Sequence, residues 1–399
     1  MKNYLLFSFV VTIITLIIIL SLPNLLPVRK LKIYNSDNEL RKDALAKGML
    51  SVPKDYKELL KIKDNYKLTR EKIALGKELY FDTNLSKNSD ISCATCHVIS
   101  KDKKYHNNAI LNGLSSADSI DERKNCIACH LRDESGVDRF SNAIGEDAKE
   151  DPFHLNTMTI LNSSLAKNLT WSAKNISVED EAGFSITSIY KMNMPSSLLV
   201  KRLKNSNIYV KKFNKAFKNN SGTDAVNFLN IQQSIGAYVR TLLTRGAYDK
   251  FLDGNNSAIS ATAKKGLADF INLGCKGCHV GMSVGGQVIK KFPLKAFFSI
   301  EALNFKTPFV SSNDDFPFEN IGGFLGKDNR HLFRVPILRN VTKTSPYFHN
   351  GSVPKIREAV SIMGKHQLGI ELSDTQIDEL VAFLKTLEGN IVDYSKDGK

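Results

Sequence analysis

The sequence predicts an all-α fold of two related domains with long loops, preceded by a transmembrane helix. Apolar residues recur with helical spacing, and few segments alternate in the way that half-buried strands do. A helix followed by one short cysteine and histidine motif occurs twice, at 69–97 and 260–279, which indicates an internal repeat. The uncharged run from Asn3 to Val28 is long enough to cross a bilayer at about 1.5 Å per residue.

Four segments carry the helical signal. In 68–81, Thr69 is the expected N-cap, and Ile73, Leu75 and Leu79 share one apolar face. The same kind of apolar stripe occurs in three further segments, at 224–245, 260–279 and 372–389. The last of these also begins with a capping box and ends at a glycine, so both of its ends are defined.

The cysteines all occur in one repeated motif, which indicates a cofactor. All 6 cysteines of the 399 residues lie in three Cys-x-x-Cys-His motifs, at 93–97, 126–130 and 275–279. Two thiols at this spacing can add to the vinyl groups of one haem, and the adjacent histidine can bind the iron. A zinc site or a redox motif would not give each cysteine pair its own histidine.

The sequence therefore predicts three covalently bound c-type haems. The expected attachment residues are Cys93, Cys96, Cys126, Cys129, Cys275 and Cys278, and the expected iron ligands are His97, His130 and His279. The motif at 126–130 has no comparable helix before it and lies in a polar stretch, which indicates a haem inserted into a loop.

With these motifs the chain divides into four parts. They are 1–30 as a membrane anchor or signal, 31–64 as a linker or N-terminal extension, 65–250 as an N-terminal haem domain with an inserted haem loop at about 101–136, and 251–399 as a C-terminal haem domain. The family resemblance described below implies that both domains are cytochrome c-like and that the C-terminal one transfers electrons.

The expected location follows from the haem chemistry. Bacteria attach haem to thiols outside the cytoplasm, so the bulk of the chain is expected on the periplasmic side of the inner membrane. No small-x-small cleavage site follows the apolar run, which favours an uncleaved anchor over a soluble periplasmic protein made by signal cleavage. The net charge of +14 suits an anionic membrane face or an acidic protein partner, and no nucleic-acid module is recognisable.

Several stretches resemble one family in order along the chain. They are "IALGKELYFDTNLSKNSDISCATCHVIS", "GVDRFSNAIG", "NTMTILN", "GLADFINLGCKGCHVGMSVGG" and "FRVPILRNVTKTSPYFHNGSVPKIREAVSIMGKHQLG". These stretches resemble the bacterial di-haem cytochrome c peroxidases and their MauG-like relatives over about residues 65–390. The resemblance implies an active haem in the N-terminal domain, an electron-transfer haem in the C-terminal domain and a calcium ion at their boundary.

The resemblance also implies roles for single residues. Met363 is the implied second iron ligand of the electron-transfer haem, and it follows Ile356 and Val360 on one helix face. Trp171, the only tryptophan, is the implied residue between the two haems, and His349 the implied histidine near their interface. The implied calcium ligands are Asn156, Thr344 and Pro346, the last two through backbone oxygens.

The chain departs from the family around the first haem. The family's distal glutamate is replaced by Lys191, which can donate a proton but is a poor base while charged. A distal histidine found in many members is replaced by Glu146. One interpretation is that Glu146, Glu179 or Glu181 takes over the acid–base role. The other is that the first haem is fully ligated, with these candidate ligands: His106, His154, Met158, Met192 and Lys191.

The function expected from the sequence is reduction of H2O2 to water, with electrons from a small cytochrome c or a membrane quinol. The alternatives are a tri-haem electron carrier and a MauG-like oxidase that lacks peroxidase activity, both favoured by Lys191. A homodimer is compatible with this expectation.

Overall fold

The structure is a computed structural model that describes residues 31–62, 65–99, 135–138, 141–217, 224–294 and 316–395. Residues 35–399 fall in one compact unit by their contacts. Its helices are α2 Asp37–Ala46, α3 Tyr56–Leu59, α4 Arg70–Phe81, α5 Cys93–Cys96, α8 Val178–Thr187, α9 Ser196–Lys204, α10 Asn207–Ala216, α11 Phe228–Val239, α12 Ala247–Leu252, α13 Ala261–Leu273, α14 Ile356–Ile362 and α15 Asp374–Thr386.

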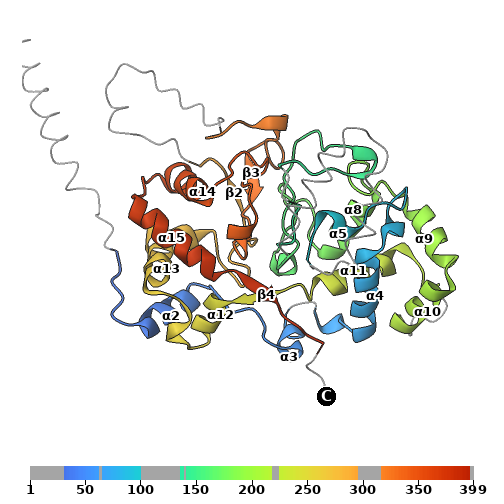
Figure 1. The fold of residues 1–399 in the computed structure, drawn as a ribbon, viewed down its shortest axis with the longest axis horizontal. Coiled ribbons are helices and arrows are strands. Elements are labelled where there is room, and N and C mark those ends of the chain that lie inside the picture. Colours follow the sequence, from blue (N-terminus) through green and yellow to red (C-terminus); the bar gives the residue numbers. More distant parts are fainter. Residues whose placement is uncertain are drawn as a thin grey trace, which may run out of the picture. The chain divides into compact units, whose positions relative to one another are not determined.

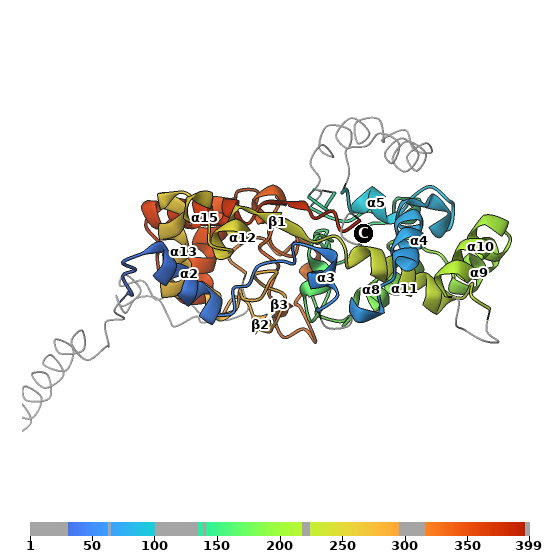
Figure 2. The ribbon, with the colours of Figure 1, turned by 90° about the horizontal axis from the view of Figure 1, so that it is seen from below.

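The helices form two groups, which can be followed in Figure 1 and, from below, in Figure 2. In one group α11 packs against α4 and α8, and α10 packs against α4 and α9. In the other group α13 packs against α15, and α15 packs against α14. Helix α2, from the segment predicted as a linker, packs on α12 and α13, so this extension is part of the folded unit.

Local sequence explains where the main helices begin. The side chain of Thr69 accepts a hydrogen bond from the backbone of Lys72, which caps α4 as predicted. The side chain of Ser260 caps α13 in the same way. Ser373 and Gln376 form the predicted capping box of α15. Helix α13 is capped at its C-terminal end by Gly274, whose φ of 108° is favourable only for glycine. The motif at 275–279 follows immediately.

The prediction of an all-α fold with an N-terminal transmembrane helix is wrong. The structure has two antiparallel ribbons: β1 Thr244–Gly246 pairs with β4 Gly389–Ile391, and β2 Ile289–Lys291 pairs with β3 Leu332–Arg334. Strands of three residues are too short to show the alternation that periodicity detects. Among the described residues, no helix is long and apolar enough to cross a bilayer, and the anchor predicted at 1–30 lies outside them.

The two main helix pairs are held together by the same contact. A Cβ atom on Gly76 of α4 would lie 1.8 Å from the backbone oxygen of Ser234 in α11. A Cβ atom on Gly266 of α13 would likewise lie 1.8 Å from the backbone oxygen of Glu379 in α15. Each pair of helices therefore touches backbone to backbone, at a distance that only glycine allows.

An aromatic pair follows each glycine. Tyr80, four residues after Gly76, packs edge-on against Tyr238 of α11, with ring centroids 5.3 Å apart. Phe270, four residues after Gly266, packs against Phe383 of α15 at 5.1 Å. The same crossing with the same aromatic spacing occurs in both helix pairs, as the internal repeat in the sequence predicts.

A buried ion pair ties the C-terminal group together. Arg339 and Asp249 are both fully buried, and two guanidinium nitrogens lie 2.8 Å from the two carboxylate oxygens. The same carboxylate accepts hydrogen bonds from the backbone of Val52 and Gly246. All the oxygen positions are used, which is the condition under which a buried charge is tolerated.

We expect Gly266→Ala to lower the free energy of unfolding by about 2 kcal/mol or more, because the added methyl group overlaps the Glu379 carbonyl. Denaturant unfolding of the haem-loaded protein measures this. The control is Lys265→Ala on the same helix, whose side chain is 71% exposed and whose pair with Glu379 contributes at most about 1 kcal/mol. Equal effects of the two substitutions would contradict the close crossing.

Candidate functional site

The first motif begins with the short helix α5. The Ser92 amide donates to the Thr95 hydroxyl at 2.9 Å, which caps the helix that carries Cys93 and Cys96. Burial raises the pKa of each cysteine thiol to about 12. A thiol pair with a raised pKa differs from a redox-active Cys-x-x-Cys, whose pKa is low.

His97 is held in one orientation by its neighbours. Its Nδ1 atom lies 3.0 Å from the carbonyl oxygen of Gly136, and the Tyr80 hydroxyl donates to its backbone oxygen at 2.6 Å. Burial lowers the pKa of His97, so the ring is neutral near pH 7. With the proton on Nδ1 and donated to Gly136, the Nε2 atom is left for a metal, which is the usual arrangement of a histidine ligand.

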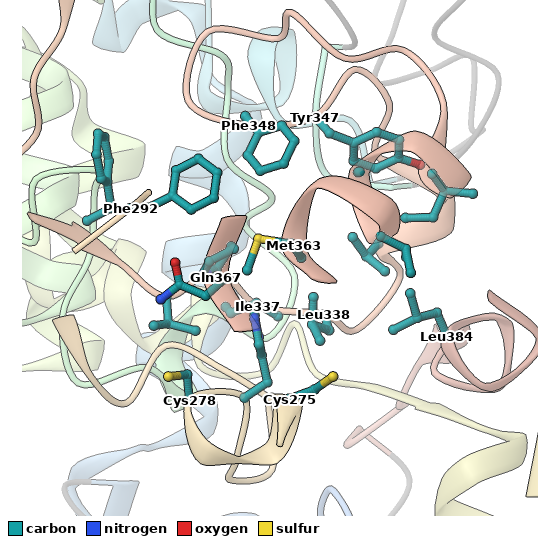
Figure 3. Close-up of a pocket in the computed structure, with 18 of the residues that line it drawn as sticks. Cys275, Cys278, Phe292, Ile337, Leu338, Tyr347, Phe348, Met363, Gln367 and Leu384 are labelled. Carbon is teal, nitrogen blue, oxygen red and sulfur yellow. The ribbon is translucent and has the colours of Figure 1, made fainter. Parts of the chain in front are cut away.

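The motif at 275–279, called the second motif from here on, lies on the wall of an apolar cavity. Cys275, Cys278 and His279 line this cavity, and Figure 3 shows Met363 on the side opposite Cys275 and Cys278. Burial lowers the pKa of His279 to about 4. The ring of Phe270 in α13 packs near the imidazole, with the two ring centroids 6.3 Å apart. Ile356 and Val360 line the same cavity as Met363, so all three share a face as predicted.

Met363 lies where the helix changes its winding. Helix α14 ends at Ile362, and a π-helical turn covers Met363–Leu368. Such turns are rare and frequently occur at functional sites. Two thiols for attachment, and an imidazole and a thioether for the iron, are the groups that a c-type haem with histidine and methionine ligands requires. Here all four line an apolar cavity. The residues present therefore fit the group that the sequence predicts.

Trp171 and His349 both hydrogen-bond the backbone of Asn156. The Trp171 indole donates to the backbone oxygen of Asn156 at 2.9 Å, and the backbone N–H of Asn156 donates to the backbone oxygen of His349 at 2.8 Å. The rings of Trp171 and His349 are 6.4 Å apart. Burial lowers the pKa of His349 to about 4, and the neutral ring pairs through Nε2 with the Asn320 side chain at 2.8 Å. Trp171 and His349 are thus joined through one backbone segment.

The predicted calcium ligands are also neighbours. The Asn156 side-chain nitrogen donates to the carbonyl oxygen of Pro346 at 2.7 Å, and Thr344 lines the same cavity as both. In this orientation the amide nitrogen, not its oxygen, faces Pro346. A cation at this point needs the amide to turn, and calcium stays a prediction.

Lys191 forms an ion pair next to the first motif. Its ammonium lies 2.7 Å from a carboxylate oxygen of Glu181 and 3.0 Å from the Ser185 hydroxyl. Burial raises the pKa of Glu181, but Lys191 and the hydrogen bonds of Asn175 and Ser185 outweigh it and hold the pKa below its usual range. Both charges of the pair act on the pKa of His97, so the pair lies within electrostatic range of the first motif.

Glu146 is buried at the edge of the same region. One carboxylate oxygen accepts a hydrogen bond from the Asn88 backbone amide at 2.6 Å, and the other is buried with no hydrogen-bond partner in the part of the chain that the structure describes. Burial, together with the neighbouring carboxylate of Asp90, raises the pKa of Glu146 to about 7. The loop around Glu146 is therefore fastened to the segment just before the first motif.

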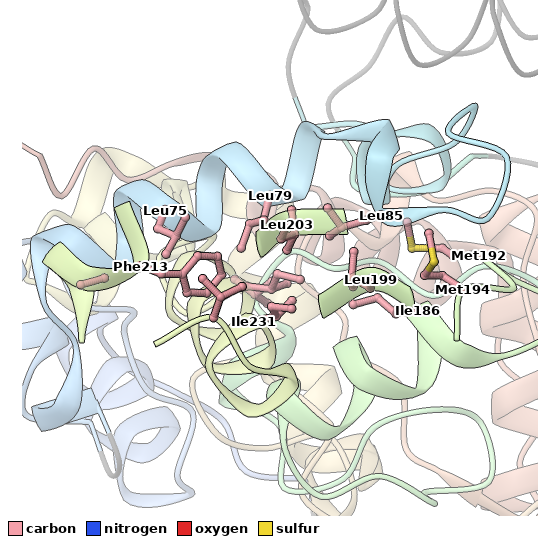
Figure 4. Close-up of a cluster of buried hydrophobic side chains, with 14 of the residues drawn as sticks. Leu75, Leu79, Leu85, Ile186, Met192, Met194, Leu199, Leu203, Phe213 and Ile231 are labelled. Carbon is pink, nitrogen blue, oxygen red and sulfur yellow. The ribbon is translucent and has the colours of Figure 1, made fainter. Parts of the chain in front are cut away.

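The other predicted ligands are scattered. Met192 is packed in a core with Met194, Leu85 and Ile186, against which Cys93 also packs (Figure 4). Met158 lines the cavity of the second motif instead. His154 has a buried Nε2 atom without a hydrogen-bond partner. Four of the predicted residues lie outside the described part of the chain: His106, Cys126, Cys129 and His130.

Sequence reasoning did not single out Arg334, which lines the cavity of the second motif. The signal for it is a single cation inside the apolar stretch "LFRVPIL". Charged residues are almost never fully buried unless they are paired, so such a residue points to an anionic partner.

Cys-x-x-Cys-His segments beside paired helices indicate a multihaem c-type cytochrome. The family model described as di-haem cytochrome c peroxidase matches residues 70–117 and 112–257. This match and the relatives named cytochrome c peroxidase and MauG support a peroxidase-like oxidoreductase of this family.

Individual relatives agree with this assignment. The chain is 29% identical over 321 residues to the cytochrome c551 peroxidase of Nitrosomonas europaea, covering 80% of each chain. It is 29% identical over 326 residues to the cytochrome c551 peroxidase of Pseudomonas aeruginosa, covering 81% of this chain and 80% of the relative. The solved structure of a MauG-like protein associated with microbial copper homeostasis has a similar fold, with a TM-score of 0.59 at 21% identity, covering 83% of this chain and 94% of that one.

We expect Glu146→Gln to stabilise the protein only above acidic pH. The pKa of Glu146 is about 7 when folded against 4.5 as the ordinary value, so the wild type loses stability as pH rises from 4.5 to 7. The variant has no proton to lose, and its advantage grows by at most about 1.4 kcal/mol per pK unit across this window. Denaturant unfolding at pH 5 and pH 8 measures it, with the exposed Glu371→Gln as control. Parallel pH curves for wild type and Glu146→Gln would contradict the raised pKa.

Proposed function

We propose that the protein reduces H2O2 to water with electrons from a small c-type cytochrome, or alternatively from a membrane quinol. The observation that carries the proposal is the haem-type cavity of the second motif, in which Trp171 and His349 are bonded through Asn156. Membership of a family whose relatives are named cytochrome c peroxidases supports it. The covalent haem chemistry supports a location on the periplasmic side of the membrane.

The residues that would hold the cofactors follow from the two sites. Cys93 and Cys96 would attach one haem with His97 on its iron. Cys275 and Cys278 would attach another, with His279 and Met363 as the residues that would bind its iron. Bound haem would supply the redox chemistry, and a methionine ligand would raise its potential. The motif at Cys126, Cys129 and His130 supports a third attached haem.

The acid–base step is assigned to the ion pair beside the first site. Cleavage of peroxide needs a proton moved from one oxygen to the other, which calls for a group that both accepts and donates. We propose Glu181 for this role, because its carboxylate lies 2.7 Å from the Lys191 ammonium in the region of His97. Lys191 then positions the carboxylate and keeps it ionised. Glu146 is the second candidate, since its pKa of about 7 suits acid–base work at neutral pH.

One observation favours a second function. Lys191 stands where the resemblance implies a glutamate, and both Lys191 and Glu181 are already engaged with each other. A pair that does not exchange protons with a substrate would leave the first site to electron transfer or to oxidation of a protein, as the MauG-like alternative requires.

The test is to add H2O2 to the partly reduced protein and follow the oxidation of a reduced small c-type cytochrome. We expect turnover, and we expect Glu181→Gln to lower kcat by about 10²–10⁴-fold, because the proton acceptor is lost. Asp180→Asn, an exposed carboxylate on the same helix, should leave the rate unchanged. The intact mass of the same preparation should exceed that of the chain by three haems.

Two outcomes would contradict the proposal. Absence of turnover in the wild type, with low-spin spectra at every haem, would leave an electron carrier. Turnover that survives Glu181→Gln but fails in Glu146→Gln would move the acid–base role to Glu146.

A further inference from the structure

Arg334 is the last residue of β3 and lies deep in the second site. Only 3% of the residue is exposed, and its side chain lines the cavity together with Cys275, Cys278 and His279. Its backbone amide donates to the carbonyl oxygen of Trp171 at 3.1 Å. The backbone of Arg334 is therefore tied to Trp171, which lines the same cavity.

The guanidinium has almost no polar partner. Its Nε and Nη1 atoms are buried without a hydrogen-bond partner among the described residues. Its Nη2 atom contacts the sulfur of Met158 at 2.9 Å, and a thioether is only a weak acceptor. Burial lowers the pKa of Arg334 to about 10, while the charge of Glu181 acts in the opposite direction, so the side chain stays charged at neutral pH. A buried charge in this condition calls for an anion.

The lining of the cavity shows which anion fits. Three cationic side chains line it, Lys290, Lys291 and Arg334, and its lining in the described part of the chain includes no aspartate or glutamate. The remaining walls are mostly apolar. The cavity thus suits a molecule with a large apolar body and acidic groups at one edge. A guanidinium matches a carboxylate best, because two parallel N–H groups meet two oxygens.

We propose that Arg334 binds a carboxylate side chain of the haem tethered at Cys275 and Cys278. The proposal rests on the covalent attachment assigned to these cysteines above, and it does not require peroxide turnover. Arg334 thereby fixes the acidic edge of the haem beside Trp171, through its own backbone contact. A cation held there also favours the more electron-rich, reduced form of the haem, which raises its midpoint potential.

The test uses Arg334→Met and Arg334→Lys in the haem-loaded protein, with Lys385→Met as the control that removes a charge from an exposed residue of α15 outside the cavity lining. Spectroelectrochemical titration gives the midpoint potentials, and thermal unfolding gives Tm. We expect Arg334→Met to lower the potential of one haem and to lower Tm, because it leaves a buried carboxylate without its partner. Arg334→Lys keeps the charge without the two-pronged geometry, so its shift should be smaller.

The opposite result has a distinct signature. If Arg334 has no anionic partner, replacing an unpaired buried cation by methionine raises Tm and leaves the potentials as in Lys385→Met. That outcome overturns the proposal. Should Arg334→Met fail to fold, Arg334→Lys decides alone: a potential lower than in the control supports the carboxylate contact, and an unchanged one refutes it. Intact mass without haem at Cys275 and Cys278 would instead refute the attachment on which the proposal rests.

Discussion

Two backbone-to-backbone helix crossings set the geometry of both described sites. At Gly76 and at Gly266 the partner helix comes so close that no side chain fits between them. The aromatic residue four positions after each glycine then contacts the histidine of the Cys-x-x-Cys-His motif in the same helix group. Tyr80 hydrogen-bonds the backbone of His97, and Phe270 contacts the ring of His279. The close crossings of α4 with α11 and of α13 with α15 thus help to position His97 and His279.

The two sites differ in what faces the histidine. At the second site the opposite wall carries Met363 in an apolar setting, which excludes water and suits a stable, fully ligated haem. At the first site the neighbouring polar groups are an ion pair, Lys191 with Glu181. Polar, exchangeable groups suit proton transfer, whereas a sulfur ligand in an apolar cavity suits electron transfer. The same repeated helix pair therefore suits proton transfer at the first site and electron transfer at the second.

Sequence predicted most of what depends on neighbours along the chain. Helix α4 begins after Thr69 and α15 begins after Ser373, because caps and apolar stripes are local signals. The ribbon that pairs Thr244 with Ile391 was missed, because its strands are three residues long and lie far apart in sequence. The pairing of Lys191 with Glu181 was also missed, because the geometry of α8 and the loop after it decides which carboxylate it meets. Met363 was predicted through the family resemblance, and the structure places it across the cavity from Cys275 and Cys278.

We propose that the cavity lined by Cys275, Cys278 and His279 holds a haem whose iron Met363 binds. A redox titration of Met363→Leu checks this, with Met49→Leu as a control for loss of a buried methionine elsewhere. Met363→Leu should lower the midpoint potential of one haem and change its spectrum, while Met49→Leu should leave every potential in place, because a methionine ligand raises haem potential. If the Met363→Leu titration instead superimposes on that of the wild type, Met363 is a packing residue and not a ligand.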